Sequence, residues 1–120
     1  MAPFKEILAA AAAALRRVPG YVEAARQRGR GQLLRAAAAR RAGGDGRAES
    51  VAAAKDFDLA LAARGDDAAT RHLRGVARFG AGDYDKALAD WREAIAADAS
   101  LDTADLREWM RHAEERAARK

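Results

Sequence analysis

A pattern of small and large side chains occurs twice in this chain, at an offset of 34 residues. The two copies are Ala53, Phe57, Ala60 and Leu61, and then Ala87, Trp91, Ala94 and Ile95. Positions spaced i, i+4, i+7 and i+8 fall on one face of an α-helix. Alanine on such a face lets a second helix approach closely, and the aromatic ring fills the space between the two helices. The repeat therefore predicts two helices that pack through the same face.

Glycine, proline and aspartate divide the chain into six predicted helices. Their approximate ranges are 3–18, 21–42, 47–64, 67–79, 84–97 and 103–118. Gly29 and Gly31 each cost about 1 kcal/mol against alanine inside a helix, so a break in the second helix stays open. The predicted N-caps of the last three helices are Asp66 or Asp67, Asp83, and Asp102. The connections are short, so neighbouring helices should run antiparallel.

Composition also predicts an all-α fold. Half of the residues are hydrophobic, but alanine supplies 35 of them, which favours closely packed helices over a deep core. The absence of cysteine excludes disulfides and thiolate metal sites. It also fits a reducing, intracellular location, either cytoplasmic or organellar. No apolar run is long enough to cross a bilayer, so no membrane span is expected.

The segment 75–98, with the sequence GVARFGAGDYDKALADWREAIAAD, resembles a tetratricopeptide repeat. Gly75 occupies the position where the first helix of a repeat touches the second, and Ala87, Trp91 and Ala94 match the pattern of the second helix. Three residues depart from the family pattern: Arg74 replaces leucine, Arg78 replaces tyrosine and Ala99 replaces the closing proline. The upstream copy matches only in its second helix.

The resemblance implies a short solenoid of antiparallel helical hairpins. We expect a basic helical arm over 1–30 and a repeat domain over 31–120, with repeats at about 32–65 and 67–99 and a capping helix at about 102–118. The apolar stripe predicted for the capping helix consists of Leu106, Trp109, Met110, Ala113 and Ala117.

The same resemblance implies a function in protein binding. Stacked hairpins form a groove lined by their first helices, and the family pattern places His72, Val76 and Phe79 on that surface. Simple solvent exposure is the competing interpretation of His72. Some members of the family bind a C-terminal carboxylate on this surface with lysine and asparagine. Because His72 and Val76 replace such residues here, we expect the partner to be a peptide or helix with apolar side chains instead. The predicted function is a non-enzymatic adaptor or scaffold subunit of a larger assembly.

Neither a catalytic, a cofactor nor a metal site is predicted. His72 and His112 are far apart in the sequence and form no metal-binding spacing. The aspartates lie at predicted caps or beside basic residues, so none has the apolar surroundings that a catalytic acid needs. The glycine-rich turns lack the Lys-Ser/Thr ending of a phosphate-binding loop.

Charge is distributed unevenly along the chain. Residues 1–44 carry nine basic and two acidic side chains, whereas residues 45–120 are mildly acidic. Arg26, Arg28 and Arg30 are the candidate contacts of this basic segment, either with an acidic protein surface or, as an alternative function, with RNA or the ribosome through residues 21–41. The Arg-Gly spacing suits a phosphate backbone, but the lack of interleaved aromatic residues makes nucleic acid the less favoured partner.

Overall fold

The computed structural model describes Ala10 and residues 21–119. The helix predicted over 3–18 falls, apart from Ala10, outside these residues. The described elements are α2 (Val22–Arg41), α3 (Arg47–Ala63), α4 (Ala68–Gly80), α5 (Tyr84–Ala97), the 3-10 turn η1 (Ala99–Leu101) and α6 (Ala104–Ala118). No strand occurs within the described part of the chain, so the predicted all-α class is confirmed.

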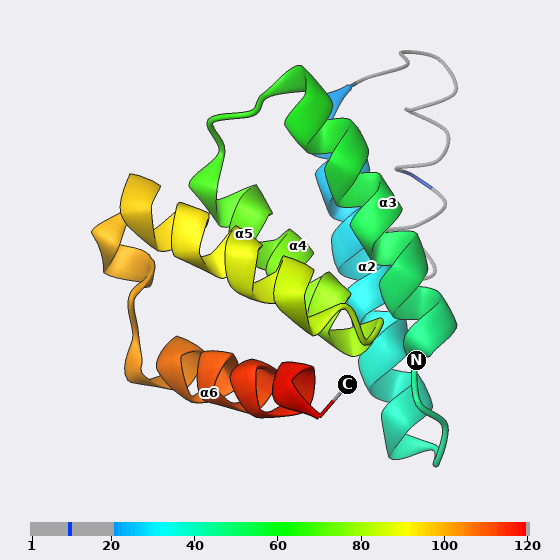
Figure 1. Cartoon of the computed structure of the whole chain (residues 1–120). Coiled ribbons are helices and arrows are strands. Elements are labelled where there is room, and N and C mark those ends of the chain that lie inside the picture. Colours follow the sequence, from blue (N-terminus) through cyan, green and yellow to red (C-terminus); the bar gives the residue numbers. More distant parts are fainter. Residues whose placement is uncertain (1–9, 11–20, 120) are drawn as a thin grey trace.

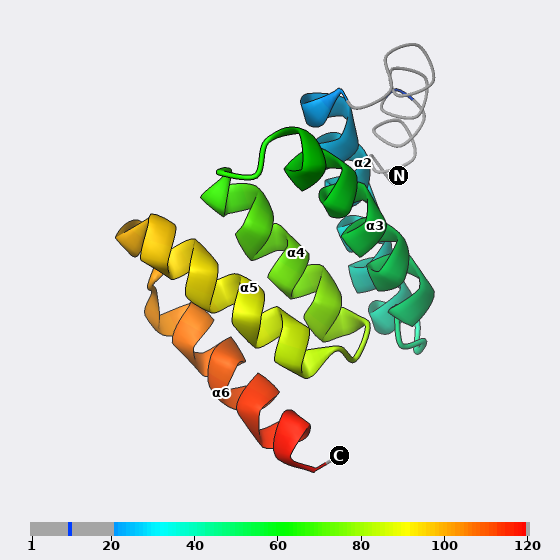
Figure 2. The ribbon, with the colours of Figure 1, turned by 45° about the horizontal axis from the view of Figure 1, so that its top comes forward.

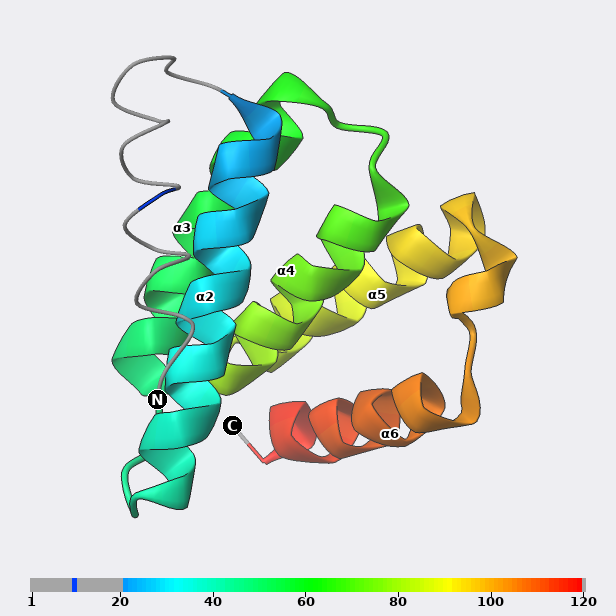
Figure 3. The same ribbon diagram turned by 180° about the vertical axis from the view of Figure 1, so that it is seen from behind.

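The helices pack in the order in which they follow one another (Figure 1). α2 and α3 form one antiparallel hairpin, α4 and α5 form a second, and α6 packs on α5 as a single last helix. Figure 2 shows α3, α4, α5 and α6 lying side by side across the molecule. Seen from behind, α2 lies in front of α3 and α4 lies in front of α5 (Figure 3). The first helix of each hairpin therefore contributes to one common side.

The repeated sequence pattern forms the buried faces of α3 and α5. Phe57 and Trp91, the aromatic residues of the two copies, are 0% and 1% exposed. Their alanine neighbours in the pattern are also buried, as is Leu61, and Ile95 is partly buried. The repeat thus marks the core of each hairpin, as predicted from its helical spacing.

A glycine faces each of these aromatic rings. A Cβ atom on Gly75 would lie 2.6 Å from Cδ1 of Trp91, and one on Gly29 would lie 2.6 Å from Cε1 of Phe57. Only glycine leaves room for the ring so close to the helix backbone. α2 therefore runs unbroken through Gly29, and the interpretation of this residue as a point of weakness misses its packing role.

The residue before each glycine pairs with the residue before each aromatic ring. Nε of Arg28 donates to Asp56 at 2.8 Å, and Nε of Arg74 donates to Asp90 at 3.0 Å. The arginine and aspartate are 28 residues apart in the first hairpin and 16 apart in the second. The first hairpin is therefore longer.

The length of the first hairpin affects the boundaries that the sequence predicts for the arm and for the first repeat. The repeat expected at 32–65 starts inside α2, and residue 30, the expected end of the arm, also lies inside this helix. Residues 22–30 and 31–41 belong to one helix, which packs along α3.

The N-cap predicted from the sequence is confirmed at α4 and is wrong at α6. The Asp67 carboxylate accepts from the Thr70 amide at 3.1 Å, which confirms this cap. The prediction of Asp102 as a cap is wrong, because the Thr103 hydroxyl accepts from the Leu106 amide at 3.1 Å. Asp102 instead binds Arg107. Asp83 holds the N-cap position of α5 without a side-chain hydrogen bond.

The environment of Asp67 predicts a pH dependence. Burial raises the pKa of Asp67, but the Thr70 hydrogen bonds and the charges of Arg26 and Arg64 outweigh it, so the pKa lies below its ordinary value of 3.8. A carboxylate with a lowered pKa stabilises the folded state above its unfolded pKa. That contribution is lost as the pH falls through the folded pKa.

Asp67→Ala is expected to lower the free energy of unfolding by about 1 kcal/mol at neutral pH, the usual loss when an N-cap is removed. The difference in the free energy of unfolding between the variant and the unmutated chain should become smaller as the pH falls below 3.8. Urea unfolding followed by circular dichroism, at neutral pH and at low pH, measures the loss of stability and its change with pH. Asp66→Ala is the control, because Asp66 is exposed and caps no helix. An equal loss in both variants would contradict the assignment of the cap.

Candidate functional site

A groove with a volume of about 650 Å³ opens between α4 and α6, and the α2–α3 turn closes one end of it. We refer to it as the α4–α6 groove. Its principal lining residues are His72, Val76 and Phe79 from α4, Leu106, Trp109 and Arg116 from α6, and Arg40, Asp45 and Arg47 from the turn and its flanks. The structure thus places the three residues predicted on α4 in one groove.

Aromatic side chains form the centre of the groove. Phe79 packs edge-on against Tyr84, with ring centroids 5.3 Å apart, and edge-on against Trp109 at 5.1 Å. The Arg116 guanidinium lies over the Phe79 ring at 5.2 Å. Trp109 is 51% exposed and Val76 is 38% exposed. The groove therefore presents apolar side chains to solvent rather than enclosing them.

The sequence predicts Trp109 only as part of the apolar stripe of the capping helix. In the structure Leu106 and Ala113 are buried, whereas Trp109 extends into the groove. The spacing gives the reason: Leu106, Met110 and Ala113 follow one line along the helix, and Trp109 lies at the edge of that line. Its position at the edge was the signal that could have separated it from the packing residues.

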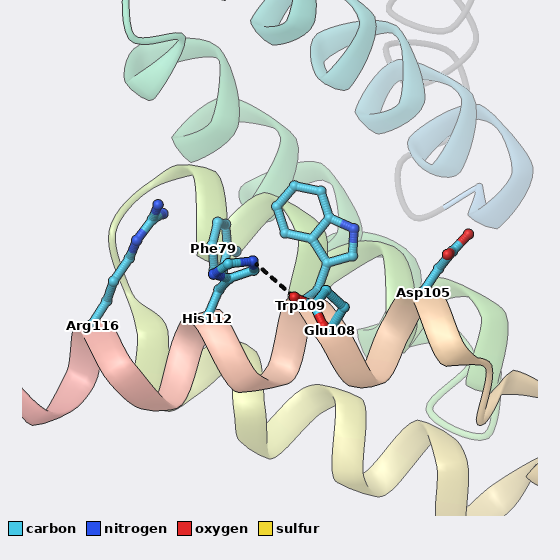
Figure 4. Close-up of a pocket in the computed structure, with 6 residues that line it drawn as sticks. All are labelled: Phe79, Asp105, Glu108, Trp109, His112 and Arg116. Atoms are coloured by element: carbon cyan, nitrogen blue, oxygen red, sulfur yellow. Dashed lines mark ion pairs between the residues drawn. The ribbon is translucent and has the colours of Figure 1, made fainter.

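A smaller cavity of about 390 Å³ adjoins α6. Figure 4 shows Trp109, His112 and Arg116 projecting from the same side of α6, near Phe79. Nε2 of His112 lies 3.5 Å from the Glu108 carboxylate, an ion pair when the imidazole is protonated (Figure 4). These are contacts along the surface of one helix, and they bring together no nucleophile and base.

His72 lies half-buried in the α4–α6 groove. Its Nδ1 atom is buried and has no hydrogen-bond partner, while its backbone carbonyl accepts from Nε1 of Trp91 at 3.1 Å. Burial lowers the pKa of His72, so the imidazole is neutral at pH 7. His72 can therefore offer a hydrogen bond to a ligand without adding charge.

The charges in the groove are separated along its length. Arg40, Arg47 and Arg116 lie toward the C-terminal ends of α2, α4 and α6, where Asp45 is the accompanying acidic residue. Nη2 of Arg47 would lie 3.1 Å from a Cβ atom on Gly82, which places this guanidinium against the α4–α5 turn. Asp105 lies in the first turn of α6, at the other end. One end of the groove is basic and the other is acidic.

The three arginines predicted as contacts of the basic arm do not form one surface. Arg28 is bound to the buried Asp56, and Arg26 pairs with Glu23 at 3.1 Å and with Asp67 at 3.6 Å. Arg30 is exposed beside a separate cavity of about 420 Å³, which is otherwise lined mainly by leucines of α2 and α4. Two of these arginines therefore hold the fold together.

The two arginines that depart from the family pattern bind one buried carboxylate. Asp90 accepts from Arg74 at 2.8 and 3.0 Å and from Arg78 at 2.9 Å. The exposed Asp58 accepts a further hydrogen bond from Arg74 at 2.8 Å. This network joins α3, α4 and α5. Each carboxylate of the network is paired with arginine.

Within the described residues, no group of three or more His, Asp and Glu side chains could hold a metal ion. None of the described helices has the length and apolar character needed to cross a membrane. Comparisons with protein-family models, with curated proteins and with solved structures found no match to the chain.

Proposed function

We propose that this chain is a non-enzymatic protein-binding adaptor or scaffold subunit, built from tetratricopeptide-like hairpins and acting within a larger assembly. Its partner segment is a peptide or helix with apolar side chains, held in the α4–α6 groove. The observation that carries the proposal is the exposure of Trp109 and Val76 inside a concave surface. An open apolar groove of this kind is a typical binding site for a peptide segment.

The packing of the second hairpin supports the tetratricopeptide-like assignment. Gly75 is in contact with the Trp91 ring, in the positions that the family pattern gives to the glycine and the aromatic residue. Arg74 and Arg78 replace an uncharged leucine and tyrosine of the family pattern, but both are bound by Asp90, so their charges are compensated. The departures from the pattern are therefore compatible with the same hairpin.

The protein-binding proposal is better supported than the RNA-binding alternative. Arg26 and Arg28 are both engaged by carboxylates of this chain. Releasing Arg28 for a phosphate would leave the buried Asp56 without its partner, which is energetically costly. The groove requires no such rearrangement.

Val76→Glu tests the proposal. Tagged full-length chain and this variant are used to capture partners, which are identified by mass spectrometry. We expect the variant to lose partners that the unmutated chain retains, because the carboxylate would have to be desolvated against the apolar partner. Val51→Glu is the matched control: Val51 is 39% exposed, compared with 38% for Val76, and lies on α3 outside the groove.

Both variants should keep the helical circular dichroism of the unmutated chain, since both valines are partly exposed. Identical sets of partners for Val76→Glu and the unmutated chain would overturn the proposal. Loss of the same partners in the Val51→Glu control would also count against the groove as the binding site.

A further inference from the structure

Three arginines at the basic end of the α4–α6 groove have no carboxylate partner among the described residues. They are Arg40, Arg47 and Arg116. By contrast, most of the arginines that face other surfaces of the described chain form ion pairs, as Arg71 does with Glu93 and Arg107 does with Asp102. Asp45, the acidic residue nearby, accepts from the backbone amide of Arg47. The end of the groove thus carries an excess of positive charge.

The ends of the helices influence where these three charges lie. Arg40 and Arg116 lie in the last turns of α2 and α6, where the partial negative charge of the helix end favours a cation. Arg47 is the first residue of α3, where the partial charge is positive and disfavours a cation. Its guanidinium, however, lies against the α4–α5 turn, at the C-terminal end of α4, where the partial charge is negative and favours a cation. Three guanidinium groups therefore gather at one end of the groove, and none of them forms an ion pair with a carboxylate of the described residues.

The charge lies next to the apolar centre of the groove. Arg116 covers the Phe79 and Tyr84 rings, with its guanidinium 5.2 and 5.9 Å from their centroids. Trp109 packs edge-on against the same Phe79 ring. An occupant that fills this centre with an apolar side chain therefore brings its neighbouring residues within reach of the arginines.

We propose that the occupant of the α4–α6 groove is an acidic peptide segment, in which an aromatic or aliphatic side chain is followed closely by aspartate or glutamate. The apolar side chain packs on Phe79 and Trp109, and the carboxylates bind at Arg40, Arg47 and Arg116. Asp105 repels the same carboxylates from the opposite end, so the charges fix the direction in which the segment lies. This inference rests on the proposed function and adds the chemistry of the partner.

The test uses a phage library of random peptides selected on the full-length chain. We expect the selected sequences to be enriched in Asp or Glu close to an aromatic or aliphatic residue, relative to the unselected library. The most enriched sequence is then synthesised with a fluorescent label, and its affinity is measured by anisotropy. Arg47→Glu should weaken binding by about tenfold or more, the scale of one hydrogen bond to a charged group.

Arg47→Glu is suited to this test because glutamate in the first turn of α3 is favoured by the helix dipole and should not destabilise the fold. Arg119→Glu is the matched control, since it makes the same change of charge on an exposed arginine that does not line the groove. A peptide with lysine in place of its acidic residue should bind Arg47→Glu better than it binds the unmutated chain.

The outcomes separate this inference from the proposed function. Selected peptides without acidic residues, or equal affinities for the unmutated chain and Arg47→Glu, would overturn the acidic partner. If Val76→Glu still abolished binding of those peptides, the groove would stand as the binding site. If the selected peptides bound Val76→Glu as tightly as the unmutated chain, or if no sequence were enriched, the result would count against both the acidic partner and the groove as the binding site.

Discussion

Replacing Trp91 with alanine is expected to lower the free energy of unfolding by about 3–5 kcal/mol, the range for removing a large buried aromatic side chain. Trp91 is 1% exposed and belongs to the cluster that joins α5 to α6 through Leu106 and Ala113. Its indole also donates to the His72 carbonyl at 3.1 Å, so this acceptor loses its partner as well. Domains of this size are stable by only about 5–15 kcal/mol. The loss is therefore a large fraction of the total.

Denaturant unfolding followed by circular dichroism measures this loss, and Trp109→Ala provides the control. Trp109 has the same side chain but is 51% exposed, so its removal should change the free energy of unfolding far less. Trp109→Ala should instead weaken peptide binding in the groove. Similar stability losses for the two tryptophans would show that Trp91 is not the centre of the second hairpin's core.

The helices and their packing faces could be predicted because both depend on local sequence. The helical spacing, repeated after 34 residues, predicts that Phe57 and Trp91 are core residues, and both are buried. The contact between Gly29 and Phe57 could not be predicted in the same way. In the longer first hairpin this glycine lies outside the 34-residue offset, and its place opposite the ring depends on the length of α2.

The two buried aspartates have a shared signal in the sequence. Asp56 and Asp90 each precede the aromatic residue of their copy, so they belong to the same repeat. Arg28 and Arg74 each precede the glycine that contacts that ring. Considered without this pairing, the Arg-Gly segment of α2 indicates a contact for a partner, whereas Arg28 is bound inside the first hairpin.

The groove could be predicted only on the side that α4 provides. His72, Val76 and Phe79 came from the family pattern of one repeat and line one cavity. Trp109, Arg47 and Arg116 come from other elements, and only the stacking of the helices brings them to the same cavity. The sequence pattern of a helix predicts only the residues that this helix contributes to a site, and not which residues of other helices lie beside them.

Asp90→Ala is expected to lower the free energy of unfolding by about 3–5 kcal/mol, the cost of removing one partner from a buried ionic network. The Asp90 side chain is 3% exposed and binds both Arg74 and Arg78, whose side chains are 16% and 21% exposed. Without Asp90, two partly buried guanidinium groups lose their main acceptor. Asp58 lies too far out in solvent to replace it, since its side chain is 51% exposed.

Asp58→Ala is the matched control, because Asp58 pairs with the same two arginines from the exposed side of the network. Its loss should cost less than about 1 kcal/mol, as is usual for an exposed ion pair. A second comparison adds Arg74→Leu and Arg78→Tyr, the residues of the family pattern, to Asp90→Ala. The triple variant should recover most of the lost stability, because no buried charge is left unpaired. If it were no more stable than Asp90→Ala alone, the cost would come from the packing volume of Asp90 and not from the charges that it compensates.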